Sequence, residues 1–262
     1  VYLYDTQISG AFPNGQTTLV SKDNKPTPQS GNLSSSTPSI SRDGCFVAFA
    51  SLSTNFGVVG VNQQIYVRGP LPGPGTCGAS EQTSLISKDN SATPVPGNGL
   101  SSAPSINSSG RFVTFTSLAS NLAPPANGQQ IYLHDRNSGP NGTTSLISKD
   151  NSPSPVQGNG PSSVPSISHD GCFVAFASLS TNFGVPGGNQ QIYTRGPLLG
   201  PGICVGTEQT SLVSKDNSLV AGNGLSNTPS ANANGAFVAF SSLSTNLGVV
   251  SGNQQIYVRA LP

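Results

Sequence analysis

A fourfold internal repeat constrains the fold of this chain more than any other feature of its sequence. The tetrapeptide Ser-Lys-Asp-Asn begins at Ser21, Ser87, Ser148 and Ser214, so successive copies are 66, 61 and 66 residues apart. Each copy accompanies the same ordered segments: Pro-Ser, a turn ending in Gly, Phe-Val-x-Phe, Gln-Gln-Ile-Tyr and Leu-(Ile/Val)-Ser. A period of this length indicates repeated supersecondary units.

The repeated segments have the composition of β-strands. Runs such as 45–49 and 64–68 last about five residues, are rich in aromatic and β-branched side chains, and are bounded by Gly, Pro, Asn or Asp. An Asp-Gly, Ser-Gly or Asn-Gly pair separates the first two strands of each unit, where a tight turn needs a positive φ. Each unit is therefore predicted to be a four-stranded antiparallel sheet whose first two strands form a hairpin.

Sheets of this kind cannot bury both of their faces alone, so neighbouring sheets must stack. The radial arrangement of stacked sheets is a β-propeller. We therefore predict an all-β fold, a β-propeller of four-stranded antiparallel blades, as one domain over residues 1–262. The predicted blade repeats cover, in order, residues 25–87, 88–148, 149–214 and 215–262.

Three segments of the first unit resemble the WD40-like repeat of TolB-type β-propellers. They are Ser-Arg-Asp-Gly-Cys-Phe-Val-Ala-Phe-Ala-Ser at 41–51, Gln-Gln-Ile-Tyr-Val-Arg at 63–68 and Thr-Ser-Leu-Ile-Ser at 83–87, and the resemblance extends over essentially the whole chain. The acidic residue that follows the third strand in that family is kept only in the second unit, as Asp135. The resemblance implies a β-propeller of a kind that is usually exported and usually binds other proteins, and it does not imply catalysis.

The two ends of the chain carry parts of a blade. Residues 1–5 match a third strand and residues 17–21 match a fourth strand, whereas the last unit has only a first, a second and a third strand. We expect residues 16–21 to complete the C-terminal blade, because closing the ring with one terminus removes an exposed sheet edge. The strand within residues 1–6 is then surplus.

Two interpretations of the surplus strand stay open. Either the chain is cut from a longer repeat array, as a start at Val1 also allows, or the strand pairs with a neighbouring molecule by β-augmentation. In the second case copies join head to tail, and a contact of this kind that does not close forms a filament. The residues of the expected assembly strands are Val1, Tyr2, Leu3, Tyr4, Asp5, Gln255, Ile256, Tyr257 and Val258.

The four cysteines form two copies of one pair. Cys45 and Cys77 are 32 residues apart, and Cys172 and Cys204 repeat that spacing 127 residues later. The second unit, with Arg111 at the first position, lacks both cysteines. Since the third strand runs back toward the first turn, the loop that follows it lies at the same sheet edge. We predict disulfides Cys45–Cys77 and Cys172–Cys204, each stabilising by about 3 kcal/mol, and hence an oxidising compartment.

Composition argues against several classes of function. The formal net charge is +1, from 11 Lys+Arg and 10 Asp+Glu, which provides no field to attract nucleic acid or an anionic membrane. No apolar run approaches the roughly 18 residues that span a bilayer. A charged fraction of 8% is low and suits a secreted protein. We expect no nucleic-acid partner, no membrane insertion, and an extracellular or cell-surface location, with the periplasm as the alternative.

The sequence contains no recognisable catalytic constellation. His134 and His169 lie at non-equivalent positions of different units and are interpreted as solvated loop residues. The repeated Lys-Asp pairs could supply a ring of Ca²⁺ ligands, but an Asp-Asn stretch after a strand more simply caps its own loop. Metal binding by the cysteines is also disfavoured, because no Cys-x-x-Cys or nearby His pair exists. We expect no cofactor, no metal and no catalytic residue.

Two functions from different classes follow from these observations. The first is an exported structural module that assembles with itself. The second is a monomeric module that binds a protein or a glycan with the face built from loops 53–62 and 89–102. The repeated glutamines before the third strand are interpreted as partners of loop backbone, and the tyrosines that follow as packing between blades. These tyrosines are Tyr66, Tyr132, Tyr193 and Tyr257.

Overall fold

The computed structural model describes residues 1–4, 17–58, 60–71, 77–78, 80–122, 127–185, 187–198, 204–248 and 252–261. Within these ranges the chain is all-β, apart from one 3₁₀ turn, η1 (Thr181–Phe183). No helix in the described residues is long and apolar enough to cross a membrane. Asp5, one of the predicted assembly residues, lies outside the described part of the chain.

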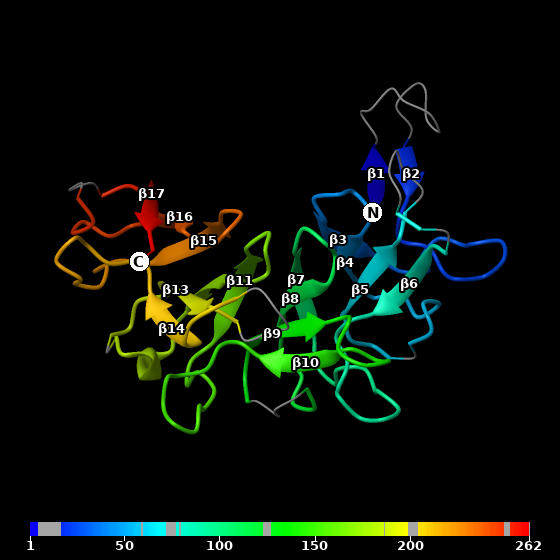
Figure 1. Cartoon of the computed structure of the whole chain (residues 1–262), viewed down its shortest axis with the longest axis horizontal. Helices are drawn as coiled ribbons and strands as arrows, with labels where there is room; N and C mark the ends of the chain where they lie inside the picture. Colours follow the sequence, from blue (N-terminus) through cyan, green and yellow to red (C-terminus); the bar gives the residue numbers. More distant parts are fainter. Residues whose placement is uncertain are drawn as a thin grey trace.

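The strands form three four-stranded antiparallel sheets, one three-stranded sheet and one two-stranded sheet (Figure 1). The first blade is β3 (Ser35–Ile40), β4 (Val47–Ser51), β5 (Gln64–Gly69) and β6 (Gln82–Leu85). The second is β7 (Ser101–Ile106), β8 (Phe112–Ser117), β9 (Gln130–Asp135) and β10 (Thr143–Leu146). The third is β11 (Ser162–Ile167), β12 (Val174–Ser178), β13 (Gln191–Gly196) and β14 (Gln209–Leu212). The last is β15 (Ser226–Ala231), β16 (Phe237–Ser242) and β17 (Gln255–Ala260), and the N-terminal pair is β1 (Tyr2–Tyr4) and β2 (Thr17–Leu19). The predicted antiparallel blades are therefore present.

The core lies between the blades, because the third strands of the first three blades, β5, β9 and β13, bury side chains on both of their faces. Ile65 and Val67 of β5 pack toward Phe115 in the second blade. Tyr66, on the opposite face of β5, stacks on Phe49 with ring centroids 6.0 Å apart. The other tyrosines of the set stack on the equivalent phenylalanines of their own blades. Tyr132 also lies in one apolar cluster with Ile65 of the preceding blade, and Tyr193 with Ile131, so these tyrosines take part in the packing between blades, as predicted.

Both disulfides have the predicted pairing. Cys45 and Cys77 have Cα atoms 5.4 Å apart, and Cys172 and Cys204 have Cα atoms 5.6 Å apart. Each bond joins the start of a second strand to the loop that follows the third strand. Disulfides persist in oxidising compartments, so this bracing is consistent with an exported protein.

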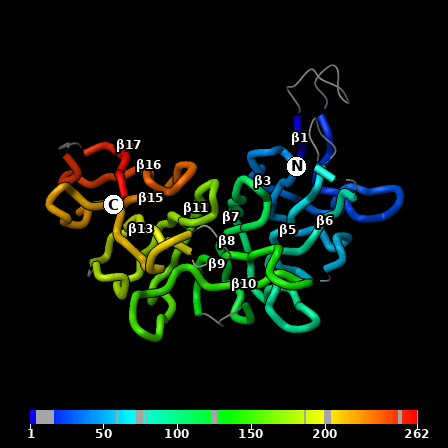
Figure 2. Tube along the Cα trace, in the orientation of Figure 1, coloured from blue at the N-terminus to red at the C-terminus, as the bar shows by residue number. Residues whose placement is uncertain are grey.

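The blades follow one another along an open arc, with the N-terminal hairpin at one end and the last blade at the other (Figure 2). Our expectation that residues 16–21 complete the C-terminal blade differs from this structure. Strand β2 pairs with β1, matching Tyr2 with Leu19 and Tyr4 with Thr17. The reason is proximity along the chain, since a local hairpin closes a far shorter loop than a contact between the two termini.

Candidate functional site

Neighbouring blades are joined by the same contacts three times. The aromatic residue that precedes or begins each second strand lies on the turn glycine of the next blade, in the pairs Phe46–Gly110, Phe112–Gly171 and Phe173–Gly235. A serine hydroxyl of each first strand also accepts a backbone N–H of the next first strand. Its three instances are Ser39 with Ile106 at 3.2 Å, Ser105 with Ile167 at 3.2 Å and Ser166 with Ala231 at 3.0 Å.

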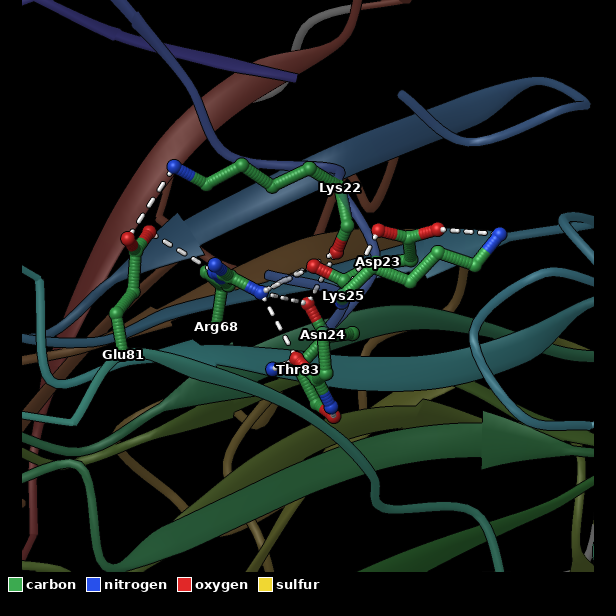
Figure 3. Close-up of polar contacts among 7 residues, drawn as sticks. All are labelled: Lys22, Asp23, Asn24, Lys25, Arg68, Glu81 and Thr83. Carbon is green, nitrogen blue, oxygen red and sulfur yellow. Dashed lines mark hydrogen bonds and ion pairs between the residues drawn. The ribbon is translucent and has the colours of Figure 1, made fainter. Parts of the chain in front are cut away.

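A buried polar cluster joins the first blade to the connection that precedes it (Figure 3). Arg68 is 2% exposed, and its Nε donates to Glu81 Oε1 at 2.8 Å. Its Nη1 donates to the carbonyl oxygens of Lys22 and Asp23 and to Thr83 Oγ1, at 3.3, 3.2 and 2.9 Å. Although burial alone would raise it, hydrogen bonds and charges from Arg68 and Lys22 lower the pKa of Glu81.

The asparagine of each of the first three Ser-Lys-Asp-Asn repeats holds the fourth strand of the next blade. Asn24 Oδ1 accepts the N–H of Thr83 at 2.7 Å, and its Nδ2 donates to the Thr83 carbonyl at 2.9 Å. Asn90 with Thr144 and Asn151 with Thr210 repeat this double hydrogen bond. This role of the asparagine was not anticipated from the sequence, although its fourfold spacing was visible.

The repeated aspartates cap their own loops, as the simpler interpretation of the sequence held. Asp89 Oδ1 accepts the backbone N–H of Val95 at 2.9 Å, and Asp150 Oδ1 accepts that of Val156 at 3.0 Å. No group of three His, Cys, Asp or Glu side chains able to hold a metal ion occurs among the described residues. The repeated glutamines also bond to backbone: Gln64 Nε2 donates to the Gly97 carbonyl at 2.8 Å.

The two ends of the arc expose the contacts that the interior blades bury. In β17, Ile256 is 73% exposed and Val258 is 67% exposed, whereas their equivalents Ile65 and Val67 in β5 are 0% and 1% exposed. Phe237 is 49% exposed, because no following blade presents a turn glycine to it. The last blade thus ends in an apolar face of the kind that, elsewhere in the molecule, another blade covers.

The opposite end carries the matching half of the contact. Gly44, the turn glycine of the first blade, has no atom within 4 Å of the position where a Cβ would lie, unlike Gly110, which contacts Phe46. Ile40 is 49% exposed, whereas its equivalent Ile106 is 6% exposed. The outer part of this face is covered by the hairpin, in which Leu3 packs against the core of the first blade.

The last blade also has an open place for a fourth strand. A cavity of about 330 Å³ lies between the connection that carries Asn217 and the side chains of Phe240, Tyr257 and Arg259. In the first blade, the equivalent side chains Phe49 and Tyr66 belong to the cluster that packs against Leu85 of the fourth strand. Arg259 donates to the carbonyl oxygens of Lys215 and Asp216 at 2.9 Å each, as Arg68 does to its own connection.

A second cavity of about 330 Å³ lies between the second and third blades, and its charged lining residues are paired. Arg111 donates to both carboxylate oxygens of Asp135 at 2.8 Å each. Lys149 lies 3.2 Å from Glu208. Four apolar side chains complete much of its wall: Phe112, Leu133, Leu146 and Leu198. The described lining residues therefore offer no unpaired acid or base to a reaction.

His134 is buried, so the interpretation of it as a solvated loop residue was wrong. It is 2% exposed in β9, at the position that Arg68 holds in β5, and its Nδ1 lies 3.0 Å from Thr144 Oγ1. The error arose because β9 continues through Asp135 before the loop begins. Burial, together with the charges of Lys88 and Arg136, lowers the pKa of His134 to about 4.

The buried imidazole predicts a loss of stability in mild acid. Below pH 6.5 the unfolded chain protonates His134, whereas the folded chain does so only near pH 4, so this contribution is complete above pH 6.5 and is lost as the pH falls toward 4. The loss should reach about 3 kcal/mol. In urea unfolding at pH 7, 5 and 4, His134→Gln should show a shallower decline than wild type. The exposed-loop control His169→Gln should keep the wild-type decline, and an unchanged decline in His134→Gln would contradict the prediction.

No protein-family model matches this sequence, and no curated protein matches it either. Among solved structures, TolB from Acinetobacter baumannii matches with a TM-score of 0.49 and 16% identity, over 99% of this chain and 48% of that chain. The putative TolB from Agrobacterium tumefaciens matches with a TM-score of 0.45 and 16% identity, over 88% of this chain and 62% of that chain. The chain is similar to TolB-like β-propellers.

Structures named after enzymes are matched as well. The periplasmic gluconolactonase PpgL from Pseudomonas aeruginosa has a TM-score of 0.37 and 14% identity, over 100% of this chain and 70% of that chain. The chain spans about half the length of the TolB from Acinetobacter baumannii. The strand order and the contacts between blades in this chain establish its all-β, bladed fold.

Proposed function

We propose that this protein is a non-enzymatic, exported structural module that joins copies of itself head to tail into an extracellular filament. The observation that carries the proposal is the complementarity of the two end blades. One end exposes the apolar side chains of Ile256, Val258 and Phe237. The other end exposes the turn glycine Gly44, which no aromatic side chain covers in the described structure. Three interfaces inside the molecule provide the template for joining such surfaces.

Two different surfaces that fit each other generate an open chain of copies unless a rotation closes them into a ring. The composition supports repeated contact between identical subunits, since a charged fraction of 8% and a net charge of +1 give little repulsion between them. The two disulfides would brace such subunits outside the cell. The partner proposed is therefore a second copy of this chain.

Sedimentation velocity over a range of concentrations tests this function. Wild-type protein should form species larger than 26.6 kDa as its concentration rises. The variant Ile256→Asp/Val258→Asp should remain monomeric, because it places two charges on the face that must be buried. Val156→Asp is the matched control, since Val156 is 55% exposed on a loop outside this face and should leave association unchanged. A wild-type protein that stays monomeric at all concentrations would overturn the proposal.

A second candidate function is a monomeric module that binds a protein or a glycan through its loop face. Apolar side chains at the ends of first and second strands favour it, because they repeat around this face and remain exposed. Leu118 donates its N–H to the Leu100 carbonyl at 2.9 Å, and the two side chains are 48% and 45% exposed. A wild-type monomer whose loop face binds a partner, and loses it on Leu118→Asp, would favour this candidate over self-assembly.

A further inference from the structure

The N-terminal hairpin reproduces the third and fourth strands of a blade. In the first blade Tyr66 pairs with Leu85 and Arg68 pairs with Thr83. In the hairpin Tyr2 pairs with Leu19 and Tyr4 pairs with Thr17, which is the same register. Strand β1 therefore occupies the place of a third strand, and β2 occupies the place of a fourth.

Hydrogen bonds beyond the ladder confirm this correspondence. The N–H of Ile65 donates to Ser87 Oγ at 2.9 Å, and the amino terminus of Val1 donates to Ser21 Oγ at 3.0 Å. In both cases, the backbone N–H of the residue after the fourth strand donates to the carbonyl oxygen of the residue that precedes the tyrosine of the third strand. These bonds are Ile86 to Ile65 at 2.8 Å and Val20 to Val1 at 2.9 Å.

The last blade contains a first, a second and a third strand, but no fourth strand among the described residues. By the same equivalence, Tyr257 of β17 corresponds to Tyr2, Val258 to Leu3 and Arg259 to Tyr4. A fourth strand beside β17 should supply a threonine near Arg259 and a leucine over Tyr257, as Thr83 and Leu85 do in the first blade. Within β2, Thr17 and Leu19 have this spacing.

We propose that β17 of a second copy of this chain replaces β1 beside β2, so that two chains together build one four-stranded blade. This inference rests on the proposed self-assembly and specifies its contact. Ile256 and Val258 would then cover the first-blade core at the places that Val1 and Leu3 hold in the hairpin. Phe237 would reach the turn at Gly44, where no atom lies within 4 Å of a Cβ position.

Several observations favour β17 over β1 as the partner of β2. Strand β1 is three residues long and belongs to a two-stranded sheet, whereas β17 is six residues long and is already paired along its length with β16. Tyr4 stands where complete blades place an arginine or a histidine, and it is 60% exposed. Two copies can pair β17 with β2 directly, whereas within one chain these strands lie at opposite ends of the arc (Figure 1).

Disulfide trapping tests this contact. By the register of the first blade, where Val67 lies opposite Ser84, Val258 of one copy should lie opposite Thr18 of the other. Directly opposite residues have Cβ atoms about 4.5–5.5 Å apart, close enough for a disulfide after a small adjustment. Thr18→Cys protein mixed with Val258→Cys protein and oxidised mildly should give a cross-linked dimer, and mass spectrometry should locate the bond between positions 18 and 258.

The controls separate the possible outcomes. A mixture of Thr18→Cys with Val156→Cys, which carries its thiol on an exposed loop, should give at least tenfold less dimer. The double variant Thr18→Cys/Val258→Cys should form its new disulfide between chains, and a bond formed only within one chain would overturn the second-copy assignment. If wild-type protein associates in sedimentation but positions 18 and 258 do not cross-link, the strand replacement fails and self-assembly stands. If wild-type protein does not associate, both fail.

Discussion

Replacing Arg68 with Met is expected to lower the free energy of unfolding by about 3–5 kcal/mol. The guanidinium is 2% exposed and bonds to Glu81, to Thr83 and to two carbonyl oxygens of the preceding connection. Methionine fills a similar volume but leaves these acceptors without their donor in a buried site. Among the described residues, Glu81 would keep only Lys22 as a charged partner, at 3.2 Å, so its pKa should also rise.

The matched control for this change is Arg259→Met. Arg259 bonds to the same two carbonyl positions of its own connection, but no glutamate or fourth-strand threonine surrounds it in the described chain. Its loss should cost about 1 kcal/mol, the scale of ordinary hydrogen bonds at a partly exposed site. Urea unfolding of both variants at concentrations where the protein is monomeric gives the comparison. Equal losses would show that the buried cluster does not stabilise the first blade as described.

Gly110→Ala is expected to destabilise the protein by about 2–5 kcal/mol, from two separate causes. Gly110 has a φ of +70°, and a side chain in this left-handed region costs about 1–2 kcal/mol. Its new Cβ would also meet the ring of Phe46 within the blade interface, and overpacking of this kind costs about 1–3 kcal/mol.

Gly44→Ala separates the two causes, because Gly44 has almost the same φ of +72° and no atom within 4 Å of its Cβ position. Gly44→Ala should therefore lower the free energy of unfolding by only about 1–2 kcal/mol, the cost of a side chain at this positive φ. Thermal unfolding of dilute protein measures both variants under the same conditions. If Gly44→Ala destabilised the monomer as much as Gly110→Ala, the close contact between Phe46 and Gly110 would make no measurable contribution to the free energy of unfolding.

Much of the fold could be predicted because it depends on features that repeat. The strand pattern, the turn glycines and the paired presence or absence of Cys45 and Cys77 all recur at fixed spacing, so each copy supports the interpretation of the others. The repeat also predicted that the blades at both ends of the chain are incomplete. The partner of β2 was predicted wrongly. The repeat pattern shows that β2 is a fourth strand, but it does not show which of the two third strands, β1 or β17, lies beside it.

The candidate site was only partly visible in the sequence. Residues 1–5 and 255–258 were predicted as assembly strands, but the fit of Phe237 to Gly44 depends on contacts between blades that no periodicity displays. The burial of Arg68 was not predicted for a related reason. A polar residue at an alternating strand position is expected to face solvent, whereas these third strands are covered on both faces by neighbouring blades.

A cryo-electron microscopy map of the assembled wild-type protein, at a resolution that traces the strands, would show directly whether two chains share one blade. We predict a continuous row of blades in which the blade at each junction contains β15, β16 and β17 from one chain and β2 from the next. A map in which copies meet through their loops, with no strand of a second chain beside β17, would rule out the shared blade.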